Sequence, residues 1–333
     1  MKAIFLCNDQ TICQRVYDRE TVEQLGSIAE LDRKVYRKED ILARPEAFKG
    51  TQVLFSTWGM PSFTEEEIKK FLPELKCVFY AAGTVQAFAR PFLACGVKVF
   101  SAWAANAVPV AELTVAQIVL ANKGYFLTNR LFHTKGYPIA RSTSQEQKGN
   151  YGETVGIIGA GMIGRLVIRM LRAYELKVIV FDPFLSDEAA KELGVEKCEL
   201  EEVFSRAFVV SNHLANNEQT KGMLQYAHFR LMRKNAVFIN TGRGAQVIED
   251  DLVRILRERP DLTALLDVTY PEPPEEGHPF YTLQNCMLTP HIAGSTGDEV
   301  ARMGLYMLRE YEAYRSGTDC RYEVTEEMLA TMA

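Results

Sequence analysis

Three side chains that could bind and protonate a small acid each follow a predicted strand in the second half of the chain. Arg243 lies between two glycines in "TGRG", Glu272 between two prolines in "TYPEP", and His291 in "TPHIAGST". A fixed guanidinium can bind a carboxylate through two hydrogen bonds. An imidazole can move a proton near neutral pH, and a neighbouring carboxylate favours its charged form. These residue types indicate acid–base chemistry on a substrate that carries a carboxylate.

Glu272 is the acid in "ALLDVTYPEPPEEGHPF" that we expect to act on a histidine. The prolines on both sides fix φ and exclude helix, so this glutamate should be held on a stiff extended segment. Glu275 and Glu276 precede a glycine in a turn and are expected to be solvated surface charges. His278 belongs to the same turn-forming run. The predicted partner of Glu272 is therefore His291, one strand later.

A glycine-rich turn, "VGIIGAGMIGR", predicts a dinucleotide site. Gly159, Gly161 and Gly164 have G-x-G-x-x-G spacing, with a predicted strand before them and a predicted helix after them. The first glycine permits the tight turn, the second lets a pyrophosphate approach the backbone, and the third lets the helix pack closely. The next strand ends in Asp182, whose carboxylate can bind the adenosine ribose and would repel a 2′-phosphate. The sequence therefore favours NAD over NADP.

The loops that follow strands are informative because ligands of doubly wound sheets bind beyond the carboxyl ends of the strands. An arginine, a carboxylate and a histidine on successive loops of this kind suit hydride transfer between nicotinamide and C2 of a 2-hydroxy or 2-keto acid. Arg243 would hold the substrate carboxylate, and His291 with Glu272 would be the acid–base pair. The cofactor carries the hydride chemistry itself. No metal site is predicted.

The elements that position these residues alternate between short β-branched or aromatic runs and longer helical patterns, which is typical of α/β folds with mostly parallel sheets. Thr64 and Glu67 form a capping box at the start of a helix in the first third of the chain. The predicted strands are residues 2–7, 53–57, 77–82 and 98–102, then 153–159, 177–182, 207–214, 236–240, 264–268 and 286–290.

Two doubly wound domains are predicted, and the first is discontinuous. Residues 1–105 and 295–333 form a substrate-binding domain, because the helix expected at about 297–315 is too short to be independent and should pack back on the first unit. Residues 106–294 form an NAD-binding domain. The polar stretch 122–150 is too long for an ordinary loop and too short for a domain, and we interpret it as an arm that packs on a neighbouring subunit.

The composition is that of a globular protein with small-molecule partners. The 333 residues are 47% hydrophobic and 24% charged with a net charge of −5, and no block of basic residues indicates a nucleic-acid or membrane surface. Seven scattered cysteines without C-x-x-C favour a reducing compartment. No apolar stretch is expected to approach the roughly 20 residues of a membrane helix. The predicted location is the cytoplasm.

Several motifs, in order along nearly the whole chain, resemble the D-isomer-specific 2-hydroxyacid dehydrogenases. They are "NAVPVAELTVAQIVLA", "VGIIGAGMIG" with Asp182, "NTGRGAQVIE", "LDVTYPEP" and "TPHIAGST". The resemblance implies a flavodoxin-like substrate domain, a Rossmann NAD-binding domain and a homodimer joined through the cofactor domain. It also implies Arg243, Glu272 and His291 as the catalytic set.

The same resemblance implies NAD contacts at a series of positions around the glycine turn and the strand ends. Where the family usually has Pro-Leu-Thr, this chain has Ala215, Asn216 and Asn217, so the wall on the adenine side is expected to be looser. The implied contacts are Gly159, Gly161, Met162, Ile163, Gly164, Asp182, Leu214, Thr220, Thr241, Gly242, Asp267 and Gly294.

The substrate side departs further from the family pattern. Where the family often has G-x-G-x-D, "AAGTVQAF" keeps Gly83 and Thr84 but has Val85 in place of the second glycine. The loop that meets the substrate carboxylate is therefore expected to have a different shape. Trp58 in "STWGMP" is expected either to line the substrate pocket or to belong to the domain core.

Two alternatives stay open from the sequence. The first is a member of the same family that acts on phosphoglycerate, hydroxypyruvate or glyoxylate. The second is a corepressor-like scaffold that senses NADH without turnover, although such proteins tend to carry long low-complexity tails and this sequence has none. A panel of 2-keto acids offered with NADH would separate an enzyme from a scaffold.

Overall fold

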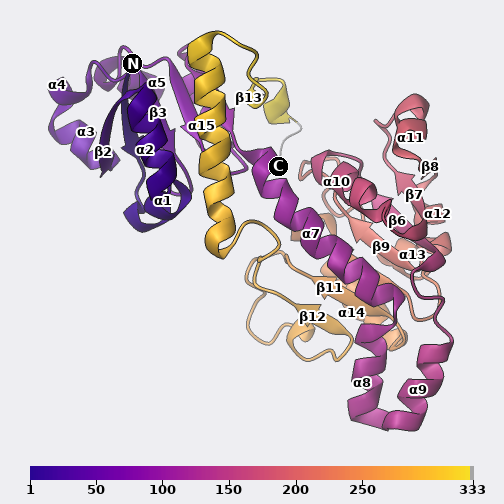
Figure 1. The fold of residues 1–333 in the computed structure, drawn as a ribbon. Helices are drawn as coiled ribbons and strands as arrows, with labels where there is room; N and C mark the ends of the chain where they lie inside the picture. The colour runs from indigo at the N-terminus through magenta and orange to yellow at the C-terminus, as the bar shows by residue number, and fades with distance from the viewer. Residues whose placement is uncertain (331–333) are drawn as a thin grey trace. The chain divides into compact units, whose positions relative to one another are not determined.

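The computed structural model describes residues 1–330, and the chain divides into two compact units. Unit 1 contains Met1–Asn106 and the chain from Ser295 onward, and unit 2 is Ala107–Gly294. The breaks predicted after residues 105 and 294 differ from these bounds by at most one residue. In both units a largely parallel sheet lies between layers of helices (Figure 1).

The sheet of unit 1 has six strands in the order β13-β5-β4-β3-β1-β2. Its five parallel strands have the order of flavodoxin-like folds, which confirms the predicted fold class. The sixth strand pairs antiparallel with β5 at one edge. The strands are β1 (Lys2–Leu6), β2 (Glu30–Tyr36), β3 (Val53–Ser56), β4 (Cys77–Tyr80), β5 (Lys98–Ser101) and β13 (Glu323–Val324).

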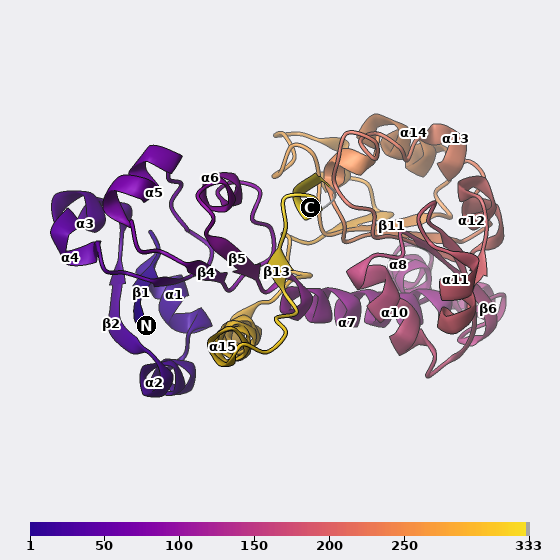
Figure 2. The same cartoon turned by 90° about the horizontal axis from the view of Figure 1, so that it is seen from above.

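Helices cover both faces of this sheet. Figure 2 shows α1, α2 and α15 on one face and α3 to α6 on the other. The predicted capping box at Thr64 and Glu67 is present, and Met303, Met307 and Tyr311 of α15 are buried in the core of unit 1. The helices are α1 (Gln10–Val16), α2 (Arg19–Ile28), α3 (Lys38–Ala43), α4 (Pro45–Phe48), α5 (Glu65–Phe71), α6 (Ala89–Ala94) and α15 (Ala301–Ser316), with short 3₁₀ turns at Gly297–Val300 and Met328–Ala330.

The sheet of unit 2 has seven parallel strands in the order β12-β11-β10-β9-β6-β7-β8. When the strands are counted from β6 along the chain, their order is that of the Rossmann fold, with β12 added at one edge. The direction in which the chain winds reverses between β6 and β9. The strands are β6 (Tyr151–Ile158), β7 (Glu175–Phe181), β8 (Glu196–Lys197), β9 (Val209–Asn212), β10 (Val237–Asn240), β11 (Thr263–Leu266) and β12 (Cys286–Leu288).

Two apolar cores lie on opposite faces of the unit 2 sheet. One packs α12, α13 and α14 on the strands, and the other packs α7, α10 and α11. The helices are α7 (Trp103–Asn122), α8 (Tyr125–Lys135), α9 (Tyr137–Gln145), α10 (Met162–Leu171), α11 (Asp187–Leu193), α12 (Leu200–Arg206), α13 (Tyr226–Phe229) and α14 (Glu249–Glu258), with 3₁₀ turns at Gly244–Gln246 and Pro279–Tyr281.

Three strands were missing from the sequence prediction, and all three lie at sheet edges. Strand β2 contains mostly charged residues, and Val35 is its one buried side chain. Strands β8 and β13 have two residues each. Edge strands need little apolar surface because one side faces solvent, so hydrophobic alternation does not reveal them.

Helix α7 is longer and more apolar than the sequence analysis expected of any segment. It has 20 residues and is long and apolar enough to cross a membrane by length and composition, so the statement that no stretch approaches this length is wrong. Half of the apolar window is buried within the protein. Ala111, Val115 and Ile118 pack into the core formed with β6 and β9. Packing on the sheet therefore accounts for the composition of this helix.

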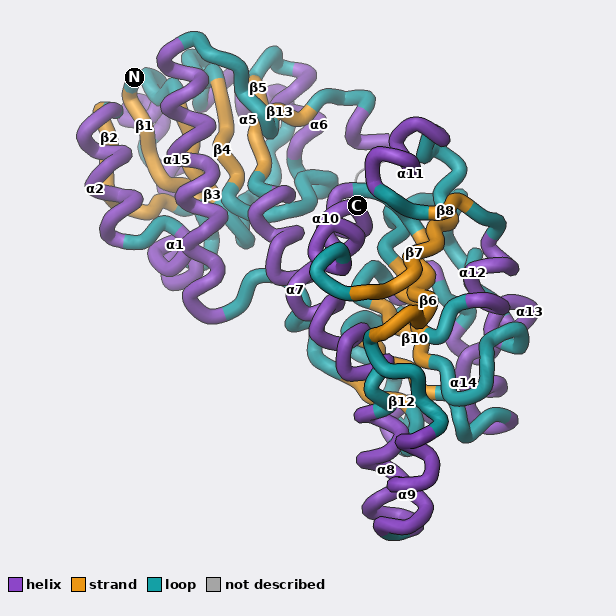
Figure 3. Tube along the Cα trace, turned by 45° about the vertical axis from the view of Figure 1, so that its right-hand side comes forward, coloured by secondary structure: helices purple, strands orange, loops and turns teal. Residues whose placement is uncertain are grey.

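The polar stretch after α7 is more regular than its sequence indicates. It forms a hairpin of two helices, α8 and α9, which Figure 3 shows at one end of unit 2. Tyr125, Phe132, Tyr137 and Ile139 of this hairpin are exposed. The weak periodicity is clearest in α8, where Tyr125 and Phe132 are exposed and Leu127 is buried, so apolar residues occur on more than one face of this helix.

Candidate active site

The glycine turn joins β6 to α10 in the manner that a dinucleotide requires. Gly159 has φ +90° and leaves no space for a side chain, since a Cβ there would lie 2.7 Å from the carbonyl oxygen of His213. A Cβ on Gly161 would meet nothing within 4 Å. The first N–H groups of α10 have no acceptors inside the helix and face outward at its N-terminus. This open, donor-rich position fits a pyrophosphate.

The two glycines offer a matched pair of substitutions. In Gly164→Ala the new Cβ would lie 2.0 Å from the carbonyl oxygen of Gly159. We therefore expect the free energy of unfolding to fall by about 1–3 kcal/mol or more, as for other overpacked sites. In Gly161→Ala we expect unchanged stability but weaker NADH binding, because the methyl group enters the pyrophosphate position. Thermal unfolding and NADH fluorescence titration separate the two effects. A Gly161→Ala variant with normal NADH affinity would contradict this placement.

Asp182 is held at the end of β7 by backbone groups. Its Oδ2 accepts a hydrogen bond from the N–H of Ala160 in the glycine turn at 2.6 Å, and its Oδ1 accepts one from the N–H of Phe184 at 2.8 Å. Each carboxylate oxygen can accept further bonds. Asp182 is therefore fixed beside the glycine turn, at the position that a ribose-binding carboxylate needs.

Strand register brings the predicted catalytic loops to one edge of the sheet. Strands β10, β11 and β12 are adjacent and parallel, with Asn240 opposite Leu266 and Leu266 opposite Leu288. Each loop leaves its strand at the same carboxyl edge, where Arg243 and His291 follow within three residues. The edge therefore gathers a guanidinium, a carboxylate and an imidazole.

Arg243 has most of its hydrogen-bonding capacity free. Its Nη1 donates to the carbonyl oxygen of Gly242 at 2.8 Å, and this is the one acceptor that its guanidinium has among the described residues. Burial lowers the pKa of Arg243, while the nearby carboxylate of Glu272 acts in the opposite direction. A partly desolvated guanidinium with most of its N–H donors unpaired can bind an anionic substrate group.

A network of buried amides holds the backbone before Arg243. Asn212 donates to the side-chain oxygens of Asn240 at 3.0 Å and Gln246 at 2.6 Å. These oxygens in turn accept the N–H groups of Gly242 at 3.1 Å and Arg243 at 3.2 Å. These three amides were not predicted from the sequence. For Asn212 and Asn240 a signal was present, because polar residues at the ends of two adjacent buried strands need partners.

His291 and Glu272 form the pair predicted from the sequence. The Nδ1 atom of His291 lies 2.7 Å from Oε1 of Glu272, and the two side chains are 44% and 42% exposed. The structure confirms this pairing over the alternative with His278. The Nε2 atom of His291 has no hydrogen-bond partner among the described residues and remains available to a substrate.

Asp267 fixes the unusual backbone of the histidine loop. His291 has φ +53°, a left-handed conformation that costs a residue other than glycine about 1–3 kcal/mol. The carboxylate of Asp267 accepts the N–H groups of Ile292 at 2.9 Å and Ala293 at 2.8 Å and the hydroxyl of Thr289. Its carbonyl oxygen accepts the N–H of His291. These bonds keep the strained loop in place.

The other predicted cofactor residues occupy several environments. Met162 is exposed and Ile163 partly buried in the first turn of α10. The hydroxyl of Thr220 closes its own loop by donating to Ala215. Thr241 is buried against Thr114. The remaining positions follow strands at the carboxyl edge of the unit 2 sheet: Leu214, Gly242 and Gly294.

The predicted substrate residues Trp58, Gly83 and Thr84 lie in unit 1, on loops after β3 and β4. These strands are adjacent and parallel, so both loops leave the same edge of that sheet. Trp58 is 36% exposed, which rules out the alternative that it belongs to the core. The carbonyl oxygen of Gly83 accepts a hydrogen bond from the Ser101 hydroxyl, so the backbone of this loop is anchored to β5.

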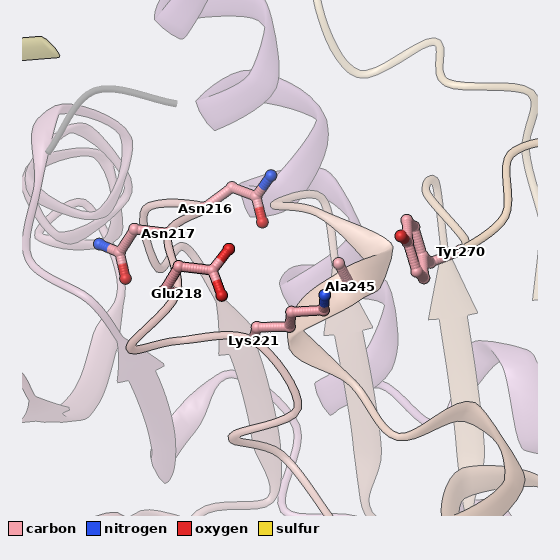
Figure 4. Close-up of a pocket in the computed structure, with 6 residues that line it drawn as sticks. All are labelled: Asn216, Asn217, Glu218, Lys221, Ala245 and Tyr270. Carbon is pink, nitrogen blue, oxygen red and sulfur yellow. The ribbon is translucent and has the colours of Figure 1, made fainter. Parts of the chain in front are cut away.

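A hollow of about 210 Å³ lies in unit 2, near the loops that follow its sheet strands (Figure 4). Its lining contains none of the predicted catalytic or cofactor residues, although Tyr270 belongs to the segment that carries Glu272. The lining residues are Asn216, Asn217, Glu218, Lys221, Ala245 and Tyr270.

A second histidine at this edge was not predicted. His213 follows β9, donates its N–H to Ile158 at 2.7 Å and shares a side-chain hydrogen bond with Ser211 at 2.9 Å. Burial lowers the pKa of His213 to about 3, so its imidazole is neutral at ordinary pH. It contributes packing behind the glycine turn instead of an exchangeable proton.

The fold and site together define a class of protein. A Rossmann sheet with a glycine turn at its switch point, an acidic residue after the next strand and an arginine with a histidine–glutamate pair is the arrangement of nicotinamide-dependent oxidoreductases. Residues 115–293 match the model of the D-isomer specific 2-hydroxyacid dehydrogenase NAD-binding domain. The chain belongs to this family, and it is an NAD-dependent oxidoreductase.

Relatives extend the comparison over the whole chain. The Bacillus subtilis protein YoaD, whose name places it among 2-hydroxyacid dehydrogenases, is 29% identical over 89% of this chain and 88% of its own. A glyoxylate reductase of Aeropyrum pernix is 34% identical over 50% of each protein. A phosphoglycerate oxidoreductase of Rhizobium etli shares the fold with a TM-score of 0.80 and 20% identity, over 98% of both chains.

Proposed function

We propose that this protein reduces a small 2-keto acid to the D-2-hydroxy acid, or oxidises it in reverse, with NAD as the cofactor. The observation that carries this proposal is the His291–Glu272 hydrogen bond of 2.7 Å on the same sheet edge as a largely unpaired Arg243. When bound, the dinucleotide supplies the hydride in reduction and accepts it in oxidation.

The protein residues would have separate roles in this reaction. Arg243 would bind the substrate carboxylate through two hydrogen bonds and orient the carbonyl group. Nε2 of His291 would donate a proton to the keto oxygen in reduction and remove one from the hydroxyl in oxidation. Glu272 would hold the imidazole through Nδ1 and favour its charged form. Trp58, Gly83 and Thr84 stay the predicted substrate-binding residues of unit 1.

Replacing Glu272 with glutamine tests the pairing. The amide keeps a hydrogen-bonding group of the same size but removes the charge that favours imidazolium, so the histidine should lose its proton at lower pH. In the oxidative direction, where neutral imidazole is the base, we expect the acid limb of the kcat/KM profile to move to lower pH. An unmoved profile would detach Glu272 from the histidine.

The proposed preference for NAD over NADP depends on Asp182, whose carboxylate would bind the ribose hydroxyls and repel a 2′-phosphate. The proposed function is tested by offering NADH and NADPH separately with 2-keto acids graded by side-chain size and charge. The panel should include glyoxylate, hydroxypyruvate and 3-phosphohydroxypyruvate, because relatives are named as a glyoxylate reductase and a phosphoglycerate oxidoreductase. Binding of NADH with no turnover of any member would favour the scaffold instead.

The proposal includes the assembly and location of the protein. The exposed apolar side chains of the α8–α9 hairpin, such as Phe132 and Tyr137, would pack on a second copy of unit 2 and form a homodimer. All seven cysteines are free thiols, which supports a reducing, cytoplasmic location. Light scattering of the purified protein tests the dimer, since a monomer at micromolar concentration would exclude it.

A further inference from the structure

The segment that carries Glu272 is weakly attached to the rest of unit 2. From Tyr270 to Gly277 almost every residue is exposed. Its internal hydrogen bonds are local: the hydroxyl of Thr269 donates to Pro271 at 3.0 Å, and the hydroxyl of Tyr281 donates to Pro274 at 3.1 Å. The prolines beside Glu272 restrict its backbone, and a contact with a packed element adds a second constraint that keeps Glu272 2.7 Å from His291.

Glu249 provides contacts at both ends of the segment. Its Oε1 accepts the N–H of Tyr270 at 2.8 Å, and its Oε2 lies 3.7 Å from Nε2 of His278. His278 packs against the buried ring of Phe280, which anchors the far end. Tyr270 precedes Glu272 by two residues, so a displacement at this end is transmitted to Glu272 over a short distance.

Glu249 itself is held in place by a packed helix. Glu249 is the first residue of α14, and its side chain is 12% exposed. The helix buries Leu252, Val253 and Leu256 in the core of unit 2. Glu249 thus connects an exposed segment to one of the well-packed helices of the sheet.

The pKa of the Glu249 carboxyl group is also shifted from its usual range. Burial raises the pKa of Glu249 to about 7, with Asp250 acting in the same direction and the N–H of Tyr270 opposing it. The other titratable groups that face its carboxyl group are His278 and Cys286. A protonated carboxyl group keeps a carbonyl oxygen that can accept the N–H of Tyr270. The amide of glutamine has the same acceptor.

We infer that Glu249 is a positioning residue for the acid–base pair: by accepting the N–H of Tyr270 at one end of the Tyr270–His278 segment and lying beside His278 at the other, it keeps Glu272 in hydrogen-bonding distance of His291. This inference rests on the proposed function for its effect on turnover. The contact itself is independent of the reaction and can be measured without it.

The test compares Glu249→Ala and Glu249→Gln with Asp251→Ala. Asp251 lies in the same turn of α14 and accepts the N–H of Tyr226 at 2.9 Å, in a different loop, so it is a matched control. We expect Glu249→Ala to lower kcat about 10-fold with unchanged NADH affinity and to move the pH profile in the direction expected for Glu272→Gln. Glu249→Gln should recover most of the loss, and Asp251→Ala should leave the profile unmoved.

A double substitution shows whether the two glutamates act in one pathway. If Glu249 acts through Glu272, adding Glu249→Ala to Glu272→Gln should cause little further loss. Losses that multiply, or a Glu249→Ala variant with a normal profile, would overturn the inference. If Glu249→Ala does not fold, Glu249→Leu takes its place in the cycle, because leucine has a similar size but no acceptor for the N–H of Tyr270.

A readout without turnover separates this inference from the proposed function. The ¹⁵N chemical shift of Nδ1 in His291 reports its hydrogen bond to Glu272 in the free protein. We expect this shift to change in Glu249→Ala and to stay constant in Asp251→Ala. An unchanged shift in Glu249→Ala overturns the inference even if the enzyme is active. A changed shift supports it even if no 2-keto acid is reduced.

Discussion

Replacing His291 with alanine is expected to lower kcat/KM for the keto acid by about 10²–10⁴-fold, the usual contribution of a positioned general acid. The imidazole can donate a proton to a substrate, since its Nδ1 is bound to Glu272 and its Nε2 has no partner among the described residues. NADH affinity should be unchanged, because the glycine turn and Asp182 lie at other strands. Steady-state kinetics and fluorescence titration measure the two quantities.

The control is His133→Ala, which removes an exposed imidazole from α8. It should keep full activity. Retention of more than a few per cent of activity in His291→Ala would remove His291 as the proton donor and leave its pairing with Glu272 as a structural feature.

Replacing Arg243 with alanine is expected to have the second large effect. Losing one partner of a desolvated, charge-assisted pair costs about 3 kcal/mol, which corresponds to roughly 100-fold or more in kcat/KM. The Arg243→Lys variant should recover only part of this loss, since an ammonium group cannot form two parallel hydrogen bonds with a carboxylate. Kinetics with a 2-keto acid and with its methyl ester make the test specific.

The ester lacks the negative charge that Arg243 would bind. The wild-type protein should therefore prefer the acid strongly, and Arg243→Ala should lose that preference through slower reaction of the acid. If the acid-to-ester ratio were the same in both proteins, Arg243 would not be the carboxylate-binding group, whatever its effect on the overall rate.

The parts of the site that could be predicted are those that local sequence determines. Glycines at fixed spacing after a strand specify a turn, and Arg243 and His291 follow strands whose apolar runs are continuous. Parallel pairing then brings their loops to one edge. The partner of Glu272 was predictable for the same reason, because the adjacent strand β12 is the one that carries His291 to that edge.

Other parts depend on contacts between distant segments. The hydrogen bond from Tyr270 to Glu249 joins residues 21 positions apart, and the bond from Ala293 to Asp267 joins residues 26 positions apart. Each carboxylate looks in the sequence like an ordinary helix-start or strand-end acid. The edge strand β2 was missed for a related reason, since its place in the sheet comes from pairing with β1 and not from an apolar pattern.

The most direct test of the proposed function follows the hydride from NADH to the product. The protein is incubated with NADH that carries deuterium at the transferable position of nicotinamide C4, together with the preferred 2-keto acid, and the product is examined by mass spectrometry and NMR. We expect one deuterium at C2 of a D-2-hydroxy acid and none on other carbons. A product without deuterium at C2, or of the L configuration, would contradict it.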